Sequence, residues 1–105
     1  MTAVTEFALL PAPGPALVVH QAAAHIRALA ERALERMARN EYWAGGWVVG
    51  VTNALGGEEG ELAGLFTPEL AMGFADWLDT VASHNARYGT PLPEFALTAA
   101  RALTP

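Results

Sequence analysis

Three glutamates among glycines are the residues whose types and spacing most suggest chemistry. Glu58, Glu59 and Glu61 stand in and beside the glycine-rich stretch 56–60. Clustered carboxylates can hold a cation or act as a general acid and base. The spacing does not match an EF-hand calcium loop, and no basic residue or helix start follows the glycines as a phosphate cradle requires. We therefore interpret the segment as a solvated acidic loop, with an acid–base or cation site as the alternative.

The usual nucleophiles and metal ligands are scarce. The sequence has no cysteine and no lysine, which excludes thiolate, Schiff-base and Walker A lysine chemistry. The single serine, Ser83, falls on the polar side of a predicted helix. His20 and His25 are five residues apart, about 140° around a helix, so they do not converge on one ion. His84 is predicted near a helix end. We therefore predict no catalytic residue, no metal site and no cofactor.

Aromatic side chains offer a different kind of chemistry, which is binding. Tyr42, Trp43 and Trp47 lie close together in the string YWAGGW. Tyrosine and tryptophan are enriched at protein–protein hot spots because they bring large, rigid contact areas. The alternative is that Trp47 closes the core. We predict that these three residues bind a partner, with Trp43 as the main contact.

The charge balance limits the classes of partner. The net charge is −5 and every basic residue is arginine. Proteins that bind nucleic acid normally present a basic face to the phosphates, so a DNA-associated regulator is disfavoured. Its recognition helix would have to carry Arg27, Arg32, Arg36 and Arg39. No apolar run approaches the length of a transmembrane helix, and the start lacks the features of a signal peptide. We expect no membrane partner and a cytoplasmic location.

The elements that position these residues are predicted as an α+β fold in one domain, 1–105. An extended leader covers 1–14, and a helix over 15–40 follows from apolar residues at spacings of three and four. The β-branched string WVVGVTN and the alternation of ELAGLF predict a two-stranded antiparallel hairpin over 46–66. A Thr-Pro-Glu start predicts a helix over 68–88, with Gly73 as a point of close approach. Its apolar face is predicted to consist of Leu70, Phe74, Trp77, Leu78, Val81 and Ala82. A short helix over 93–103 ends the fold.

One stripe of the first helix is a candidate dimer seam. A helix of 25 residues is about 37 Å long, whereas a compact chain of this size has a radius of gyration of about 13 Å. The helix would therefore overhang its own core or pack against a second copy. The predicted seam is lined with small and aliphatic residues, namely Ala22, Ile26, Leu29 and Ala33.

Four strings carry a resemblance to a known type of protein. They are HIRALAERAL (25–34), GGWVVG (45–50), ELAMGFADWLDTVASHNARYGTP (69–91) and ALTAARAL (96–103). In these strings the chain resembles small uncharacterised α+β proteins of actinobacteria and their phages. The resemblance implies a phage or mobile-element accessory role in which the protein binds a host protein.

Together these observations predict a non-enzymatic protein-interaction module, with a homodimer as a possible form. A small-molecule-binding protein or minor enzyme, using the acidic loop or His84 near the tryptophans, is the alternative. A deep pocket that joins those groups would favour this alternative.

Overall fold

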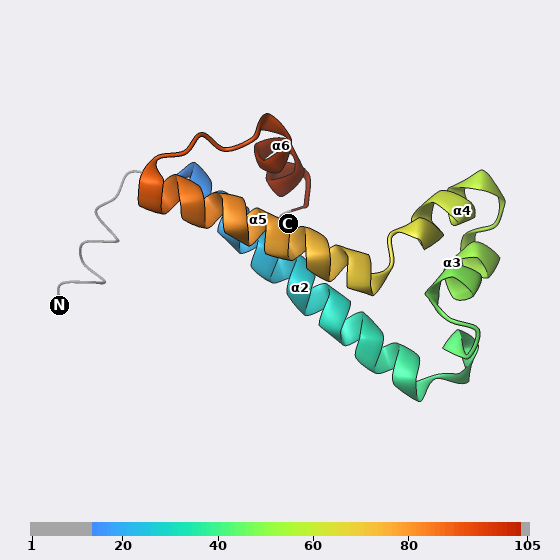
Figure 1. Cartoon of the computed structure of the whole chain (residues 1–105). Helices are drawn as coiled ribbons and strands as arrows, with labels where there is room; N and C mark the ends of the chain where they lie inside the picture. Colours follow the sequence, from blue (N-terminus) through green and yellow to red (C-terminus); the bar gives the residue numbers. More distant parts are fainter. Residues whose placement is uncertain (1–13, 104–105) are drawn as a thin grey trace.

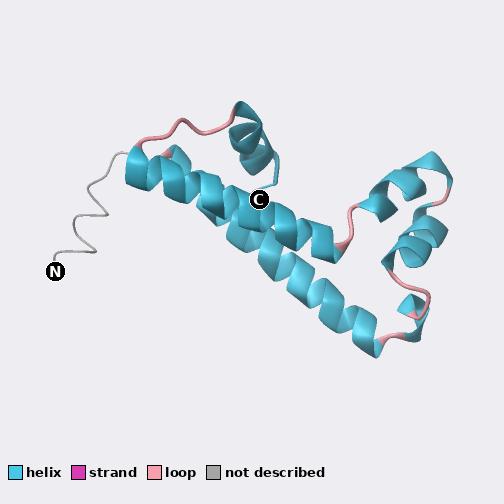
Figure 2. Cartoon of the chain, viewed as in Figure 1, coloured by secondary structure: helices cyan, strands magenta, loops and turns pink. Residues whose placement is uncertain are grey.

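The computed structural model describes residues 14–103, and every regular element in that range is a helix (Figure 2). The elements are α2 (Pro15–Arg39), the short 3-10 helix η1 (Glu41–Trp43), α3 (Trp47–Leu55), α4 (Gly57–Leu65), α5 (Pro68–Tyr88) and α6 (Glu94–Leu103). The α+β prediction is therefore wrong, because no strand forms between residues 14 and 103. Residues 1–13 of the predicted leader, 1–14, lie outside the described residues.

The bounds of α5 follow from residues at its two ends. The hydroxyl of Thr67 accepts a hydrogen bond from the N–H of Leu70 at 3.1 Å, and Pro68 occupies the first turn. Gly89 ends the helix in the left-handed conformation, with φ of 71°, and donates its N–H to the carbonyl of Asn85. This conformation costs glycine little because it has no Cβ. The observed helix coincides with the predicted range 68–88.

Helices α2 and α5 lie side by side and antiparallel along most of α5 (Figure 1). Of the thirteen buried apolar residues in the described range, nine are alanines, and the only large side chains completely buried are those of Leu78 and Val19. Small side chains let the two helix backbones approach closely, but they bury little apolar area for each residue. The core is therefore thin for a chain of this length. It consists of Val19, Ala22, Ala23, Ile26, Ala30, Ala71, Ala75, Leu78, Ala82, Ala96 and Ala100.

The last helix completes this core. After the turn at 89–93, α6 packs against α2 through its completely buried alanines, Ala96 and Ala100. Leu92 and Leu97 add partly buried apolar area to the same cluster. Because α6 covers only one side of the α2–α5 pair, a large part of α5 still faces solvent.

The segment 46–66, predicted as a hairpin, forms the two short helices α3 and α4 instead. They pack against each other at the far end of α2 (Figure 1). Gly60 and Gly64, four residues apart, lie on the α4 face that meets α3. A Cβ added at Gly60 would lie 3.0 Å from the carbonyl oxygen of Thr52, and one at Gly64 would lie 3.4 Å from that of Val48. Contact between the helix backbones thus overrides the β-propensity of the valines, and Gly56, with φ of 72°, makes the turn between them.

Gly50 in α3 is required by the aromatic residues of η1. A Cβ at this position would overlap the ring of Trp43 and come within 3.3 Å of Tyr42. The hydroxyl of Tyr42 also donates a 2.6 Å hydrogen bond to the carbonyl of Gly50. The fold of this end therefore depends on the absence of a side chain at position 50.

We expect Gly50→Ala to destabilise the α3 end, although alanine is the better helix former. The matched control is Gly73→Ala in α5, where an added Cβ meets no atom within 4 Å. In dilute protein, where the single chain is measured, that change should stabilise the fold by about 1 kcal/mol from helix propensity alone. Urea unfolding of both variants, followed by circular dichroism and tryptophan fluorescence, measures the contrast. Equal shifts of the same sign would contradict the packing described for Gly50.

Candidate functional site

Four aromatic rings form a continuous surface cluster on α5, α6 and the residue that follows α4. We call Phe66, Phe74, Trp77 and Phe95 the aromatic patch. Phe74 is its centre, with ring centroids 6.4 Å from Phe66, 5.8 Å from Trp77 and 6.2 Å from Phe95. Trp77 and Phe95 close the cluster at 6.4 Å. Rings at these separations attract one another, so the patch is a preformed surface.

Most of the patch is open to solvent. The exposed fractions are 45% for Phe66, 38% for Trp77 and 64% for Phe95, and the neighbouring Leu70 is 54% exposed. Contiguous exposed apolar surface is uncommon on monomeric proteins and marks sites of interaction. The patch therefore has the composition of a binding hot spot, in which large aromatic side chains supply most of the contact energy.

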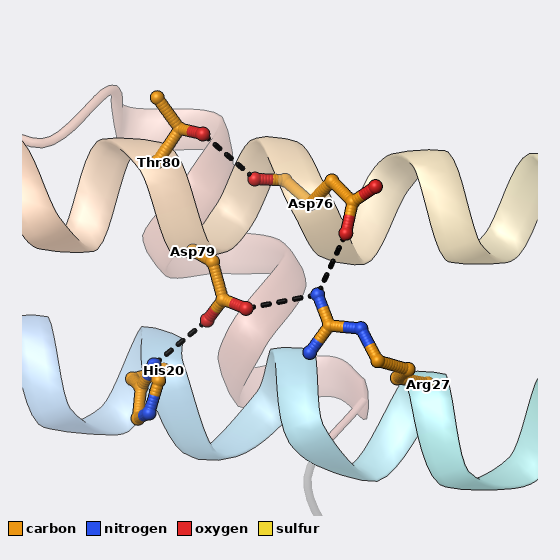
Figure 3. Close-up of polar contacts among 5 residues, drawn as sticks. All are labelled: His20, Arg27, Asp76, Asp79 and Thr80. Atoms are coloured by element: carbon orange, nitrogen blue, oxygen red, sulfur yellow. Dashed lines mark hydrogen bonds and ion pairs between the residues drawn. The ribbon is translucent and has the colours of Figure 1, made fainter.

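A polar cluster fastens α2 to α5 (Figure 3). One guanidinium nitrogen of Arg27 donates to Asp76 Oδ1 and to Asp79 Oδ2, both at 2.8 Å. His20 Nδ1 donates to the other oxygen of Asp79 at 2.7 Å. The hydrogen bonds with Asp76 and Asp79 raise the pKa of Arg27, so it stays cationic. Pairs this close to solvent contribute at most about 1 kcal/mol each, so the cluster orients the two helices more than it stabilises them.

The polar cluster does not form a hydrolytic triad. His20 and Ser83 line one surface cavity of about 360 Å³, next to Asp79, and the set invites comparison with a Ser-His-Asp arrangement. In such a triad the serine hydroxyl must lie within hydrogen-bond reach of the histidine. Ser83 makes no hydrogen bond to His20, so the contact that would activate the serine is not formed.

The predicted aromatic contact residues lie together, but they pack on one another. Trp43 stacks on Trp47 with ring centroids 5.4 Å apart, and Tyr42 meets Trp43 edge-on at 5.0 Å. Trp43 and Trp47 are half-buried, whereas Tyr42 is 51% exposed. These side chains join η1 to α3, which leaves less of their area for a partner than the aromatic patch offers.

The acidic residues of the predicted loop lie on a helix and stay apart from the cavities. Glu58, Glu59 and Glu61 are all exposed on α4. Between residues 14 and 103, no group of three or more His, Asp or Glu is arranged to hold a metal ion. Two surface cavities, of about 360 Å³ and about 210 Å³, are lined by other residues and not by these glutamates or by His84.

The stripe predicted as a dimer seam is largely occupied within the chain. Ala22 and Ile26 are buried in the core that α2 shares with α5. Leu29 is 48% exposed and, with Ala33, borders an apolar cavity of about 210 Å³. The complete lining of this cavity is His25, Ile26, Leu29, Ala30, Ala33, Trp47, Phe66, Pro68, Ala71 and Leu103.

The 210 Å³ cavity offers few groups that could orient a ligand. Its lining residues carry only two polar side-chain groups, the imidazole of His25 and the indole nitrogen of Trp47. That nitrogen is covered by protein atoms and has no hydrogen-bond partner in the described range. Ligand sites normally combine apolar walls with a few convergent polar groups. This geometry therefore does not favour the small-molecule alternative.

Sequence reasoning missed the patch because it assigned the apolar residues of α5 to one face. The buried face of α5 consists of Pro68, Ala71, Ala75, Leu78 and Ala82. Leu70 and Trp77 lie on a second apolar face, which points to solvent. The sequence does contain a signal for both faces. One set of residues at spacings of three and four is rich in alanine, and a second set with the same spacings carries the larger apolar and aromatic side chains.

No family model, curated protein or solved structure matches this chain. The resemblance to small proteins of actinobacteria and their phages therefore stays a prediction. None of the helices in the described range is both long enough and apolar enough to cross a membrane.

Proposed function

We propose that this protein is a non-enzymatic interaction module that binds another polypeptide through the aromatic patch. The observation that carries the proposal is the set of contacting rings of Phe66, Phe74, Trp77 and Phe95, three of which are more than one-third exposed. Exposing such rings is unfavourable in an isolated chain, and covering them stabilises a complex by about 25 cal/mol for each Å² of apolar area buried.

The distribution of apolar side chains supports the same function. Alanine lines the core, while large side chains such as Leu62, Leu70 and Phe95 are more than half exposed. A chain selected only for stability would place its large side chains inside, because each contributes about 1.5–3 kcal/mol when fully buried. An outer surface richer in large apolar side chains than the core is expected of a protein that acts by contact.

The remaining parts of the proposal concern location and partner class. The cytoplasm is the proposed location, and a sequence without cysteine does not depend on an oxidising compartment for its stability. The net charge of −5 disfavours a nucleic-acid partner. An accessory role in a phage or mobile element remains a prediction from the resemblance.

Position-specific photo-crosslinking in the cells that produce the protein tests the proposal. A crosslinking amino acid at position 95 stands in the aromatic patch, and one at position 36, an exposed arginine of α2, is the control. We expect discrete protein adducts from position 95 and none from position 36. No adduct from position 95, or the same adducts from both positions, would overturn the proposal.

A further inference from the structure

The outer face of α5 carries a second apolar stripe with the spacing of a helix–helix seam. Its residues follow each other at intervals of four, three, four, three and four, which is the repeat of coiled-coil a and d positions. They are Leu70, Phe74, Trp77, Val81, His84 and Tyr88. We call this set the outer stripe.

The outer stripe is only partly covered within the chain. Phe74 and Val81 are half-buried and reach the core, and Phe95 of α6 contacts Phe74 and Trp77. The exposed part of the stripe is Leu70 (54%), Trp77 (38%), His84 and Tyr88 (68%). The outer stripe contains no Asp, Glu, Lys or Arg along its whole length. A continuous, uncharged seam of this length fits another helix better than an extended peptide or a small molecule.

Gly73 is a second observation on the same face. It is exposed in the middle of α5, and an added Cβ would meet no atom within 4 Å. Glycine costs about 1 kcal/mol relative to alanine in a helix interior, and no contact among residues 14–103 requires it here. Gly73 is one turn before Trp77, so the helix surface next to that ring carries no side chain at this position. A glycine at such a place permits close approach by a second helix.

The charges at the edge of the outer stripe determine which helix fits. Glu69 lies in the first turn of α5 and Arg87 in the last. They are 18 residues apart, which is five full turns and about 27 Å, so they share one edge of the helix. Both are exposed, and neither forms an ion pair within the described range. A partner helix that complements them must carry a base opposite Glu69 and an acid opposite Arg87.

A second copy of α5 running in the opposite direction meets this requirement. We infer that the protein forms a two-fold dimer in which the outer stripes of two α5 helices pack antiparallel and cross near Trp77. Glu69 of each copy then lies beside Arg87 of the other, and Gly73 faces the turn 81–84 of the second copy. In a parallel two-fold pair the same edges of the two copies lie on opposite sides of the seam, and neither Glu69 nor Arg87 meets an opposite charge. This inference rests on the proposed function and specifies the partner.

Charge reversal tests the dimer and its orientation by sedimentation equilibrium. Wild-type protein should approach twice the 11.1 kDa chain mass as its concentration rises. Glu69→Arg and Arg87→Glu should each weaken association about tenfold, since two ion pairs are replaced by two repulsions. The double variant restores both pairs and should return to within about threefold of wild type.

The double variant also separates association from helix stability. Glu69 and Arg87 interact favourably with the helix dipole, so reversing both makes each helix end less stable. The single chain of the double variant should therefore be less stable than that of either single variant, while the association of the double variant recovers. If Glu69 and Arg87 only stabilised the helix, association would not recover.

A wild-type mass that stays at 11.1 kDa, or a double variant that associates no better than the single variants, would overturn the inference. Crosslinks from position 95 to a different protein, together with a monomeric mass, would leave the proposed function standing and remove only the homodimer.

Discussion

Replacing Leu78 with alanine should lower the free energy of unfolding by about 3 kcal/mol, within the 2–5 kcal/mol range of such core truncations. Leu78 and Val19 are the only large side chains completely buried in the described range. The surrounding residues are mainly alanines, such as Ala75 and Ala82, whose short side chains cannot move to fill the space. The resulting cavity therefore adds to the lost transfer free energy.

This loss is large for a domain whose total stability is about 5–15 kcal/mol. Urea unfolding followed by circular dichroism, performed on dilute protein, measures it. Leu29→Ala is the matched control, because that leucine is 48% exposed and its truncation should cost less than about 1 kcal/mol. If Leu78→Ala costs no more than Leu29→Ala, the α2–α5 interface described above is not the core of the protein.

The second large effect is expected at the neighbouring residue. Trp77→Ala should weaken association about 100-fold, since truncation of a central aromatic residue costs 2 kcal/mol or more in a hot spot. Trp77 contacts Phe74 and Phe95 and lies where the two α5 helices are proposed to cross. In a two-fold dimer the loss occurs in both copies.

Trp77→Ala should leave the helix content of the chain unchanged, because Trp77 is on the outer face of α5. Leu62→Ala is the control, since Leu62 is 73% exposed on α4 and away from the outer stripe. Sedimentation equilibrium measures the association of both variants. Equal association of Trp77→Ala and wild type would show that the outer stripe is not the contact surface.

The three helices over 15–40, 68–88 and 93–103 could be predicted from the sequence. The Thr67 and Pro68 start signal and the Gly89 stop signal bound α5, and the apolar period bounds α2. These signals are local, because a cap or a periodic stripe acts within the helix that contains it. The predicted ranges 15–40, 68–88 and 93–103 therefore agree with the observed helices to within one residue at each end.

The error at 46–66 arose where tertiary contacts outweigh local propensity. Val48, Val49 and Val51 favour a strand, and the alternation around Leu62 and Gly64 favours its partner. The spacing of glycines at 57, 60 and 64 was the better signal, since three and four residues are the intervals of one helix face. At Gly60 and Gly64 this face lies directly against backbone atoms of α3. The β-propensity of single residues contains no information about such a contact between helices.

The aromatic patch could not be predicted for a related reason. Trp43 and Trp47 are predicted to contact a partner because tryptophan is enriched at hot spots, and in the structure these two rings stack on each other. Their role in binding stays a prediction. Leu70 and Trp77 were assigned to the core because they are apolar residues on a helix. Only the structure shows that alanines fill the α2–α5 interface and that these larger side chains face outwards.

The most direct measurement of the central claim is the solvent accessibility of Trp77 itself. In a chain carrying Trp43→Phe and Trp47→Phe, Trp77 is the only remaining tryptophan, so iodide quenching of the fluorescence reports on the outer stripe alone. We expect strong quenching in dilute protein and progressive protection as concentration raises the sedimentation mass. Association that leaves the quenching of Trp77 unchanged would contradict the account, because the chains would then be meeting through another surface.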